Sequence, residues 1–372
     1  MDRRQFVHVS VAGLAGLALG EKGVSAEARR KKSAGESYNV VIVGDTHYDA
    51  LPDTIYHTGY SDKDPKREAN HRKEFVRNAE MWESRCPRLV KRAACLADDD
   101  TRMFLQMGDL IQGDTGDAAN HMKMLDDAYS MLKTAFGPLP LVTVAGNHDM
   151  RGTDDAVARQ AYIDYMMPKM SSELGKDITK TTYAFTLGGD AYIVIDFNKP
   201  DDEEIERLLK ETSGARYTFI VIHGPVFPYD SPKYYNWILH GRDHKDEARR
   251  HFRELFAQRN AIVLCGHTHN TEFADWYGDG GRITQMTMHS VWAREELGRY
   301  NVLAEGPEQY GTLSALKQEK AAPLFEEYRP GLKRYSFSRA AGSYKLKVSD
   351  EGVFVDFYAG DSTQRSERFI LR

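Results

Sequence analysis

Two histidines, His267 and His269, directly follow the apolar run from Ala261 to Cys265. In an extended segment alternate side chains point to the same side, so both imidazoles are expected to reach one cluster of metal ions. Four earlier apolar runs also end in short polar clusters, which are Gly44-Asp45-Thr46-His47, Gly108-Asp109, Gly146-Asn147-His148-Asp149 and His223-Gly224. Asp, His and Asn side chains supply oxygen and nitrogen ligands, so these five endings together predict a metal-binding site.

The apolar runs themselves predict buried strands, over residues 38–43, 103–107, 139–145, 217–222 and 261–265. Helical spacing is found over residues 68–96, with an interruption at Pro87, and over 117–136, 203–211 and 243–259, and residues 182–196 predict a hairpin. Open α/β sheets place ligands at the carboxyl ends of their strands, so the five clusters are expected to meet. Further strands are predicted over residues 282–291, 334–337, 343–348 and 353–358.

Each cluster taken alone also has a purely structural interpretation. Asp-x-His and Gly-Asp commonly form turns at strand ends, Asn147 is a typical helix cap, and His223 before Gly224-Pro225 is a typical turn residue. Three more histidines, His240, His244 and His251, lie at helical spacing near Arg249, Arg250 and Arg253 and predict a solvated helix face. His289 is predicted to pack within a strand.

As an ordered set, the clusters resemble the motif string of the calcineurin-like metallophosphoesterase superfamily, which runs D-x-H, G-D, G-N-H-D/E, H and G-H-x-H. All five blocks occur in this order between Asp45 and His269. The resemblance covers about residues 38–291. It implies an α/β fold, namely a four-layer αββα sandwich of two mixed sheets flanked by helices, which the C-terminal strands extend.

The resemblance also implies a dinuclear metal centre. One ion would be bound by Asp45, His47 and His269, the other by Asn147, His223 and His267, and Asp109 would bridge both. Mixed oxygen and nitrogen ligands suit Mn, Fe, Zn or Co and leave the identity of the two ions open. His148 would lie over the substrate, where it stabilises the phosphoryl group or protonates the leaving oxygen, and Asp149 would orient its ring.

The implied activity is hydrolysis of a phosphomonoester or phosphodiester of a small molecule by in-line attack of a metal-bound hydroxide. The competing hypothesis is a non-catalytic metal-binding or interaction module on the same scaffold. Because every implied ligand and His148 are present, the enzyme is favoured. In the purple acid phosphatase branch a tyrosine follows the bridging aspartate by three residues. Gln112 stands there in this sequence, so a colourless site is expected.

Candidates for substrate contact are Tyr48, Arg151 and the aromatic loop over residues 227–237, although packing of this loop on its own domain is an equal alternative. Asp114 and Asp117 follow the bridging aspartate and are expected to repel further negative charge. This favours substrates with one phosphate.

The N-terminus resembles a twin-arginine export signal. It has Arg3-Arg4, a weakly apolar stretch over residues 7–20 and small residues around a cut after Ala26 or Ala28. An anchoring helix is the alternative, but the apolar stretch is short for spanning a bilayer. We therefore expect a signal peptide over residues 1–26, a flexible leader over 27–37, and a single domain over 38–372. This domain would comprise a core to about residue 291 and a β-rich extension over 292–372. The expected location is the periplasm or another extracytoplasmic space, without a stable membrane anchor after cleavage.

The overall composition limits the classes of partner. The net charge is −5 with 28% charged residues, so no general attraction to nucleic acid is expected. Three cysteines without a CxxC motif argue against a disulfide framework, and Cys265 is predicted to be a small buried residue. The oligomeric state is left open.

Overall fold

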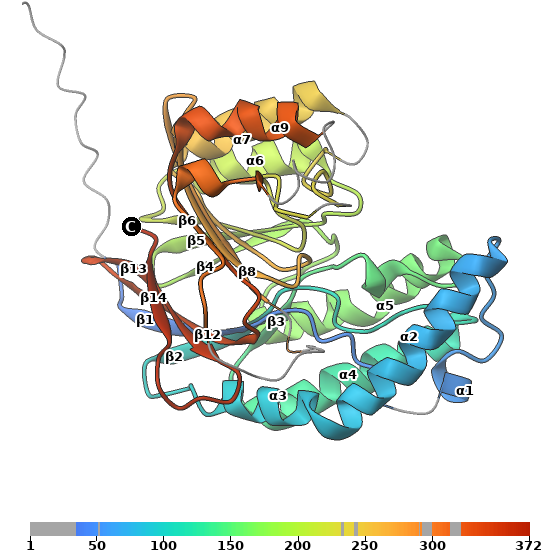
Figure 1. Cartoon of the computed structure of the whole chain (residues 1–372). Coiled ribbons are helices and arrows are strands. Elements are labelled where there is room, and N and C mark those ends of the chain that lie inside the picture. Colours follow the sequence, from blue (N-terminus) through green and yellow to red (C-terminus); the bar gives the residue numbers. More distant parts are fainter. Residues whose placement is uncertain are drawn as a thin grey trace, which may run out of the picture. The chain divides into compact units, whose positions relative to one another are not determined.

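In the computed structural model the chain forms two β-sheets whose facing sides share one apolar core (Figure 1). The structure describes residues 35–50, 53–231, 234–241, 245–289, 291, 300–312 and 321–372. The predicted signal peptide, residues 27–34 of the predicted leader, and His244 lie outside the described residues.

The first sheet has six strands in the order β14-β13-β12-β1-β2-β3. Its parallel part consists of β1 (Tyr38–Val43), β2 (Thr101–Gln106) and β3 (Leu141–Thr143). The antiparallel part consists of β12 (Gly342–Ser349), β13 (Gly352–Ala359) and β14 (Glu367–Ile370). Because β12 pairs antiparallel with β1, C-terminal strands supply half of this sheet.

The second sheet has eight strands in the order β10-β11-β8-β9-β7-β6-β5-β4. Four neighbouring strands are parallel, and these are β5 (Asp190–Ile195), β6 (Thr218–Ile222), β7 (Ile262–Cys265) and β9 (Gly281–Thr287). The antiparallel strands are β4 (Tyr183–Leu187), β8 (Thr271–Gly278), β10 (Ala304–Glu305) and β11 (Leu332–Ser338). Both sheets are therefore mixed.

Apolar residues on both faces of the central strands explain this layering. In β6, Phe219 and Val221 join the core between the sheets, whereas Ile220 and Ile222 join a second core on the opposite face. Side chains alternate along a strand, so a continuous apolar run such as β6 must be covered on both sides. The other sheet covers one face of β6, and the helices cover the opposite face.

Helices form the outer layers (Figure 1). The helices beside the first sheet are α2 (Pro65–Ser84), α3 (Cys86–Ala94), α4 (Ala118–Phe136) and α5 (Asp155–Leu174), and the short α1 (Asp53–Tyr56) packs on α4. The helices beside the second sheet are α6 (Asp202–Glu211), α7 (Asp246–Gln258) and α9 (Ala322–Tyr328). Single 3₁₀ turns are η1 (His148–Met150), η2 (Pro307–Gln309) and η4 (Arg329–Gly331). The predicted four-layer α/β sandwich is confirmed.

Some elements were not predicted from the sequence. Helix α5 contains Pro168, a residue that disfavours a helix interior, although Ala158, Ala161, Tyr162, Met166 and Met170 are buried at helical spacing. Strand β8 carries Glu272 and Asp275 at buried positions and therefore lacks a continuous apolar run. The predicted solvated helix face was wrong for His240, which is buried and precedes α7. It was also wrong for Arg249 and Arg253, which are buried and pair with Glu327. Within the described part of the chain, no helix combines the length and apolarity needed to cross a membrane. All three cysteines are free, and Cys265 is buried.

A buried ion pair of the second sheet, between Asp190 on β5 and Arg216 before β6, is tied to the first sheet through Tyr38. Arg216 donates from Nε and Nη2 to the carboxylate of Asp190, at 3.0 and 2.7 Å. The hydroxyl of Tyr38 on β1 donates to the same carboxylate at 2.8 Å. Because both charged side chains are almost fully covered, each depends on the other for compensation.

We expect Arg216→Met to destabilise the fold by about 3 kcal/mol, since it leaves the Asp190 carboxylate buried without a cation. Urea unfolding followed by circular dichroism measures this change. Arg207→Met on α6, whose partners lie at the surface, is the matched control and should leave the midpoint nearly unchanged. Equal midpoints for the two variants would contradict the structural role of the pair.

Candidate metal centre

The predicted ligands lie at the carboxyl ends of parallel strands in both sheets. Asp45 follows β1, Asp109 follows β2 and Asn147 follows β3 in the first sheet. His223 follows β6 and His267 follows β7 in the second sheet. The structure thus brings together clusters that are far apart in the sequence, as the strand pattern predicted.

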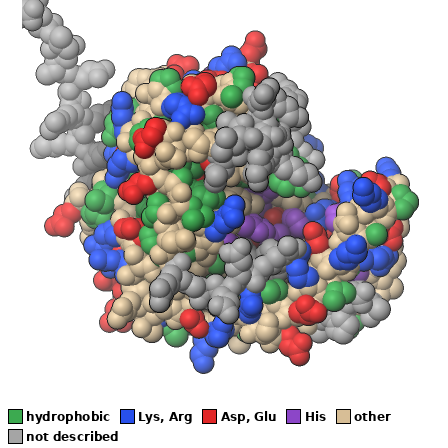
Figure 2. Space-filling view, in the orientation of Figure 1, with side chains coloured by type: hydrophobic (Ala, Val, Ile, Leu, Met, Phe, Trp, Pro, Cys, Tyr) green, Lys and Arg blue, Asp and Glu red, His purple; other side chains and the backbone are tan. Residues whose placement is uncertain are grey.

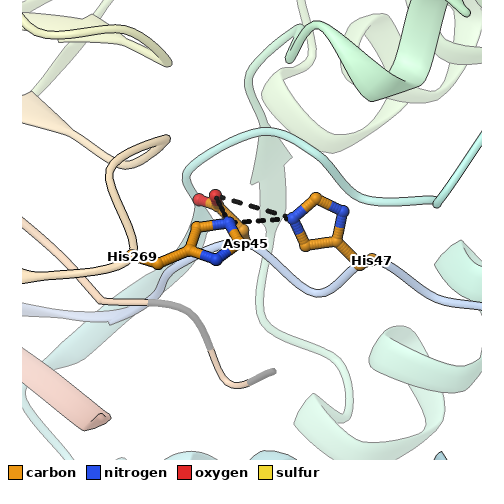
Figure 3. Close-up of side chains that lie close together, drawn as sticks. All are labelled: Asp45, His47 and His269. Atoms are coloured by element: carbon orange, nitrogen blue, oxygen red, sulfur yellow. Dashed lines mark hydrogen bonds and ion pairs between the residues drawn. The ribbon is translucent and has the colours of Figure 1, made fainter. Parts of the chain in front are cut away.

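One group of side chains consists of Asp45, His47 and His269 (Figure 3). Nε2 of His269 lies 3.0 Å from both Asp45 Oδ2 and His47 Nε2. A carboxylate and two imidazole nitrogens that converge at such distances form a donor set suited to a transition-metal ion.

A second group consists of Asp109, His223 and His267. Nε2 of His223 lies 3.2 Å from Asp109 Oδ2 and 3.1 Å from His267 Nδ1. Nδ1 of His223 donates to the carbonyl oxygen of Met107 at 2.8 Å. This contact leaves Nε2 of a neutral His223 with its lone pair toward the centre, which is the usual arrangement of a ligating histidine.

Asp109 connects the two groups. Its Oδ2 also lies 3.8 Å from His47 Nε2, and its Oδ1 accepts the backbone N–H of His148 at 2.7 Å. The side-chain oxygen of Asn147 is buried and finds no hydrogen-bond partner among the residues that the structure describes. An orphaned buried oxygen beside a shared carboxylate fits a ligand role, so the donor set fits a metal centre at which Asp109 is shared.

Several ligands have unusual backbone angles. His47, Asp109, His267 and His269 have φ values of 40°, 49°, 68° and 53°, in the left-handed region that non-glycine residues rarely adopt. The prediction that His267 and His269 alternate in an extended segment was therefore wrong, because a tight turn presents both rings. Gly266 permits this turn, since a Cβ there would lie 2.4 Å from Asp45 Oδ1.

The electrostatics of the centre follow from burial and from the charge of Asp109. Burial would raise the pKa of Asp109, but His223, His148 and His47 outweigh it and hold the pKa well below its ordinary value. Burial lowers the pKa of His47 to about 4 and that of His267 to about 3. Burial opposes protonation of His223 too, but the Asp109 carboxylate prevails and raises its pKa to about 10.

A third group of possible ligands joins His148 to His47 and Asp109, one residue from each of the other two groups. His148 belongs to neither predicted ligand set. Its ring centroid is 4.5 Å from that of His47, and its Nδ1 donates to the carbonyl oxygen of Gln112 at 2.9 Å. Burial, followed by the charge of Arg151, holds the pKa of His148 well below its ordinary value. A neutral ring with its proton on Nδ1 has Nε2 as its acid–base atom.

The role predicted for Asp149 needs correction. Its carboxylate accepts the backbone N–H of Ile111 at 3.0 Å and of Gly146 at 2.8 Å, and thus ties together the loops that follow β2 and β3. Burial, followed by the charge of Asp109, raises its pKa to about 7. The group that orients the His148 ring is the Gln112 carbonyl rather than Asp149. Because this is a backbone group, no residue pattern reveals it.

A cavity of about 1210 Å³ opens over the centre. Figure 2 shows histidine side chains gathered in a hollow on this face. The substrate candidates that line the cavity are Arg151, Tyr229, Tyr234 and Trp237. The Trp237 ring stacks on that of His267, with 5.7 Å between the ring centroids. Tyr48 instead is buried and packs on Trp82. The aromatic loop is therefore part of the cavity wall.

The expectation that Asp114 and Asp117 repel an anionic substrate was wrong. Asp114 is fully buried and paired with Arg151 at 2.5 Å. Asp117 caps α4, where its carboxylate accepts the backbone N–H of Asn120 at 2.8 Å. Neither carboxylate is among the residues that line the cavity.

A sequence profile of calcineurin-like phosphoesterases matches residues 38–271. Among solved structures, PhoD has a TM-score of 0.52 at 11% identity, over 91% of this chain and 69% of that one. Purple acid phosphatase PPD1 from yellow lupin (Lupinus luteus) has a TM-score of 0.50 at 14% identity, over 90% of this chain but only 53% of that one. At these identities the likenesses show the fold alone. No curated protein matches.

We expect His267→Ala and His269→Ala each to lose mainly the ion of its own group, because the two rings face different ligand sets. Elemental analysis of protein loaded with Mn²⁺ should fall by about one equivalent in each variant. His251→Ala on the exposed side of α7 is the control and should keep the full complement. Loss of all metal from either variant would show that the two groups do not act as separate sites.

We also expect metal affinity to increase with pH. With a pKa of about 10, His223 carries a proton at neutral pH and must release it to become a ligand, whereas His47 and His267 are already neutral. One released proton corresponds to an affinity gain of about tenfold per pH unit. Titration with Mn²⁺ between pH 6 and 8 measures it, and an affinity independent of pH would contradict the protonation of His223.

Proposed function

Because the chain belongs to the calcineurin-like phosphoesterase family, we propose that it is a hydrolase that cleaves phosphate esters of small molecules with two metal ions bound. The observation that carries this proposal is the sharing of Asp109 by two groups of metal-ligating side chains under one large cavity. Mn, Fe, Zn and Co all suit these ligands. When bound, the ions would supply charge to the phosphoryl oxygens and acidify the attacking water.

The protein's own groups hold and orient the reactants. Asp45, Asp109 and the four histidines of the two groups would hold the ions, and the Met107 carbonyl fixes the tautomer of His223. The cavity is large enough for an organic leaving group as well as a phosphate. Tyr229, Tyr234 and Trp237 offer aromatic faces for that group.

His148 is proposed as the group that handles the proton of the leaving oxygen. Burial and Arg151 keep its ring neutral, so Nε2 must first accept a proton, which the attacking water releases. The negative charge of a bound phosphate opposes both effects and favours the protonated ring, which then donates to the leaving oxygen. The Gln112 carbonyl keeps Nε2, rather than Nδ1, available for this transfer.

We further propose that the protein is exported and acts outside the cytoplasm. The Arg3-Arg4 pair, the weakly apolar stretch and the small residues near Ala26 support this location. Fractionation of cells that produce the full chain, with Arg3→Lys/Arg4→Lys as the blocked control, tests it. Cytoplasmic retention of both forms would reject export.

The direct test of the proposed activity is an assay with Mn, Co, Zn and Fe in turn against p-nitrophenyl phosphate and bis-p-nitrophenyl phosphate. Release of nitrophenolate that requires added metal supports the proposal. Protein that binds two ions and cleaves neither ester would instead favour the non-catalytic binding module.

We expect His148→Ala to retain both ions and to lose about 10²- to 10⁴-fold in kcat, the usual contribution of a general acid–base group. Elemental analysis and steady-state kinetics on one preparation measure both quantities. His251→Ala again serves as the histidine control. Undiminished turnover with two bound ions would remove His148 from the mechanism.

A further inference from the structure

A buried carboxylate holds an arginine at the wall of the cavity. Asp114 lies in the loop after Asp109, with φ of 56° and no solvent exposure. Its Oδ2 accepts a hydrogen bond from Arg151 Nη2 at 2.5 Å, and its backbone N–H donates to the Arg151 carbonyl at 2.7 Å. Because side chain and backbone are both tied, Arg151 is fixed relative to the centre.

The position of Arg151 follows from its place in the chain. It ends the η1 turn that carries His148, and its backbone N–H donates to the His148 carbonyl at 3.2 Å. The loops approach so closely that a Cβ on Gly113 would lie 2.2 Å from the same carbonyl oxygen. Arg151 is therefore a rigid neighbour of the group that we propose for proton transfer.

The guanidinium of Arg151 has a donor that the described residues leave without an acceptor. The side chain lines the cavity and is 24% exposed, and its buried Nε finds no hydrogen-bond partner in the described part of the chain. A fixed cation with spare donors beside a phosphate site is suited to an anionic ligand.

Three other arginines line the cavity, and each has an acidic partner of its own. Arg77 lies 3.9 Å from Glu74, measured from Nη2 to Oε1. Arg159 donates to Asp196 and Thr181 through Nη2 and contacts Met150 through Nη1. Arg67 pairs with Asp62 and is 64% exposed. What distinguishes Arg151 from these three is its backbone, which is hydrogen-bonded both to His148 and to Asp114.

We propose that Arg151 binds the phosphoryl group of the substrate and selects phosphomonoesters over phosphodiesters, with Asp114 as its positioning residue. A monoester carries nearly two negative charges above its second pKa of about 6, whereas a diester carries one. A guanidinium donates to adjacent phosphate oxygens in a planar fork and gains most from the doubly charged group. This inference rests on the proposed function and specifies its substrate class.

The test uses the full chain loaded with Mn²⁺, as wild type, Arg151→Gln and the surface control Arg207→Gln. We expect Arg151→Gln to lower kcat/KM for p-nitrophenyl phosphate about 10- to 100-fold, as expected for a lost charge-assisted hydrogen bond. For bis-p-nitrophenyl phosphate the loss should stay below about threefold, since a singly charged ester gains less from the cation. Calorimetry should show that Arg151→Gln binds inorganic phosphate more weakly than the wild type, by a factor similar to its loss in kcat/KM for the monoester. Arg207→Gln should match the wild type in both assays and in the calorimetry.

Asp114→Asn tests the positioning role separately. It should raise KM for the monoester and leave kcat within about threefold, because binding rather than proton transfer depends on the orientation of Arg151. A loss in kcat at constant KM would overturn this role. Partial recovery of monoester activity in Arg151→Lys, which restores the charge without the fork, would support charge recognition.

Equal losses on both esters, or an unchanged affinity for inorganic phosphate in Arg151→Gln, would overturn the inference. Failure of the proposed function gives a different result. In that case the wild type with bound Mn²⁺ cleaves neither ester, and the calorimetric comparison still decides whether Arg151 binds the anion.

Discussion

The structure depends on a single buried carboxylate at the junction of its two sheets. Asp109 follows β2 of the first sheet and lies 3.2 Å from His223, which follows β6 of the second. The same oxygen lies 3.8 Å from His47, and the other oxygen holds the backbone of His148. A buried carboxylate is costly unless positive charge or hydrogen bonds compensate it. The imidazoles that follow the neighbouring strands can compensate Asp109 either by carrying a proton or by binding a metal cation beside it. Binding of a cation thereby stabilises the arrangement of the sheets as well as preparing the site.

Several ligand residues at this junction have strained backbone angles. The left-handed angles of His47, Asp109, His267 and His269 are each unfavourable for residues with a Cβ. They are maintained because the strands that precede them are locked between apolar layers and cannot shift. In β7, for example, Ile262 and Leu264 face the other sheet while Val263 and Cys265 face the helices. The rigid core thus holds ligand positions that the loops alone would not adopt.

Much of this arrangement was predictable from local sequence. Continuous apolar runs such as Thr218–Ile222 predicted buried parallel strands, and the polar residues after them predicted where ligands gather. The failures concern interactions between distant residues. No local pattern indicates that Asp114 pairs with Arg151 and fixes it, that the Gln112 carbonyl rather than Asp149 orients His148, or that β8 buries Glu272. The turn at His267 and His269 was also missed, because their spacing fits an extended strand equally well.

Anomalous diffraction from crystals of the protein grown with Mn²⁺ tests the central claim most directly, which is that Asp109 is shared by two metal ions. The account predicts two anomalous peaks about 3.5–4 Å apart, on either side of the Asp109 carboxylate. One peak should be next to Asp45, His47 and His269, and the other next to Asn147, His223 and His267. A single peak, or two peaks of which one does not contact Asp109, would contradict it.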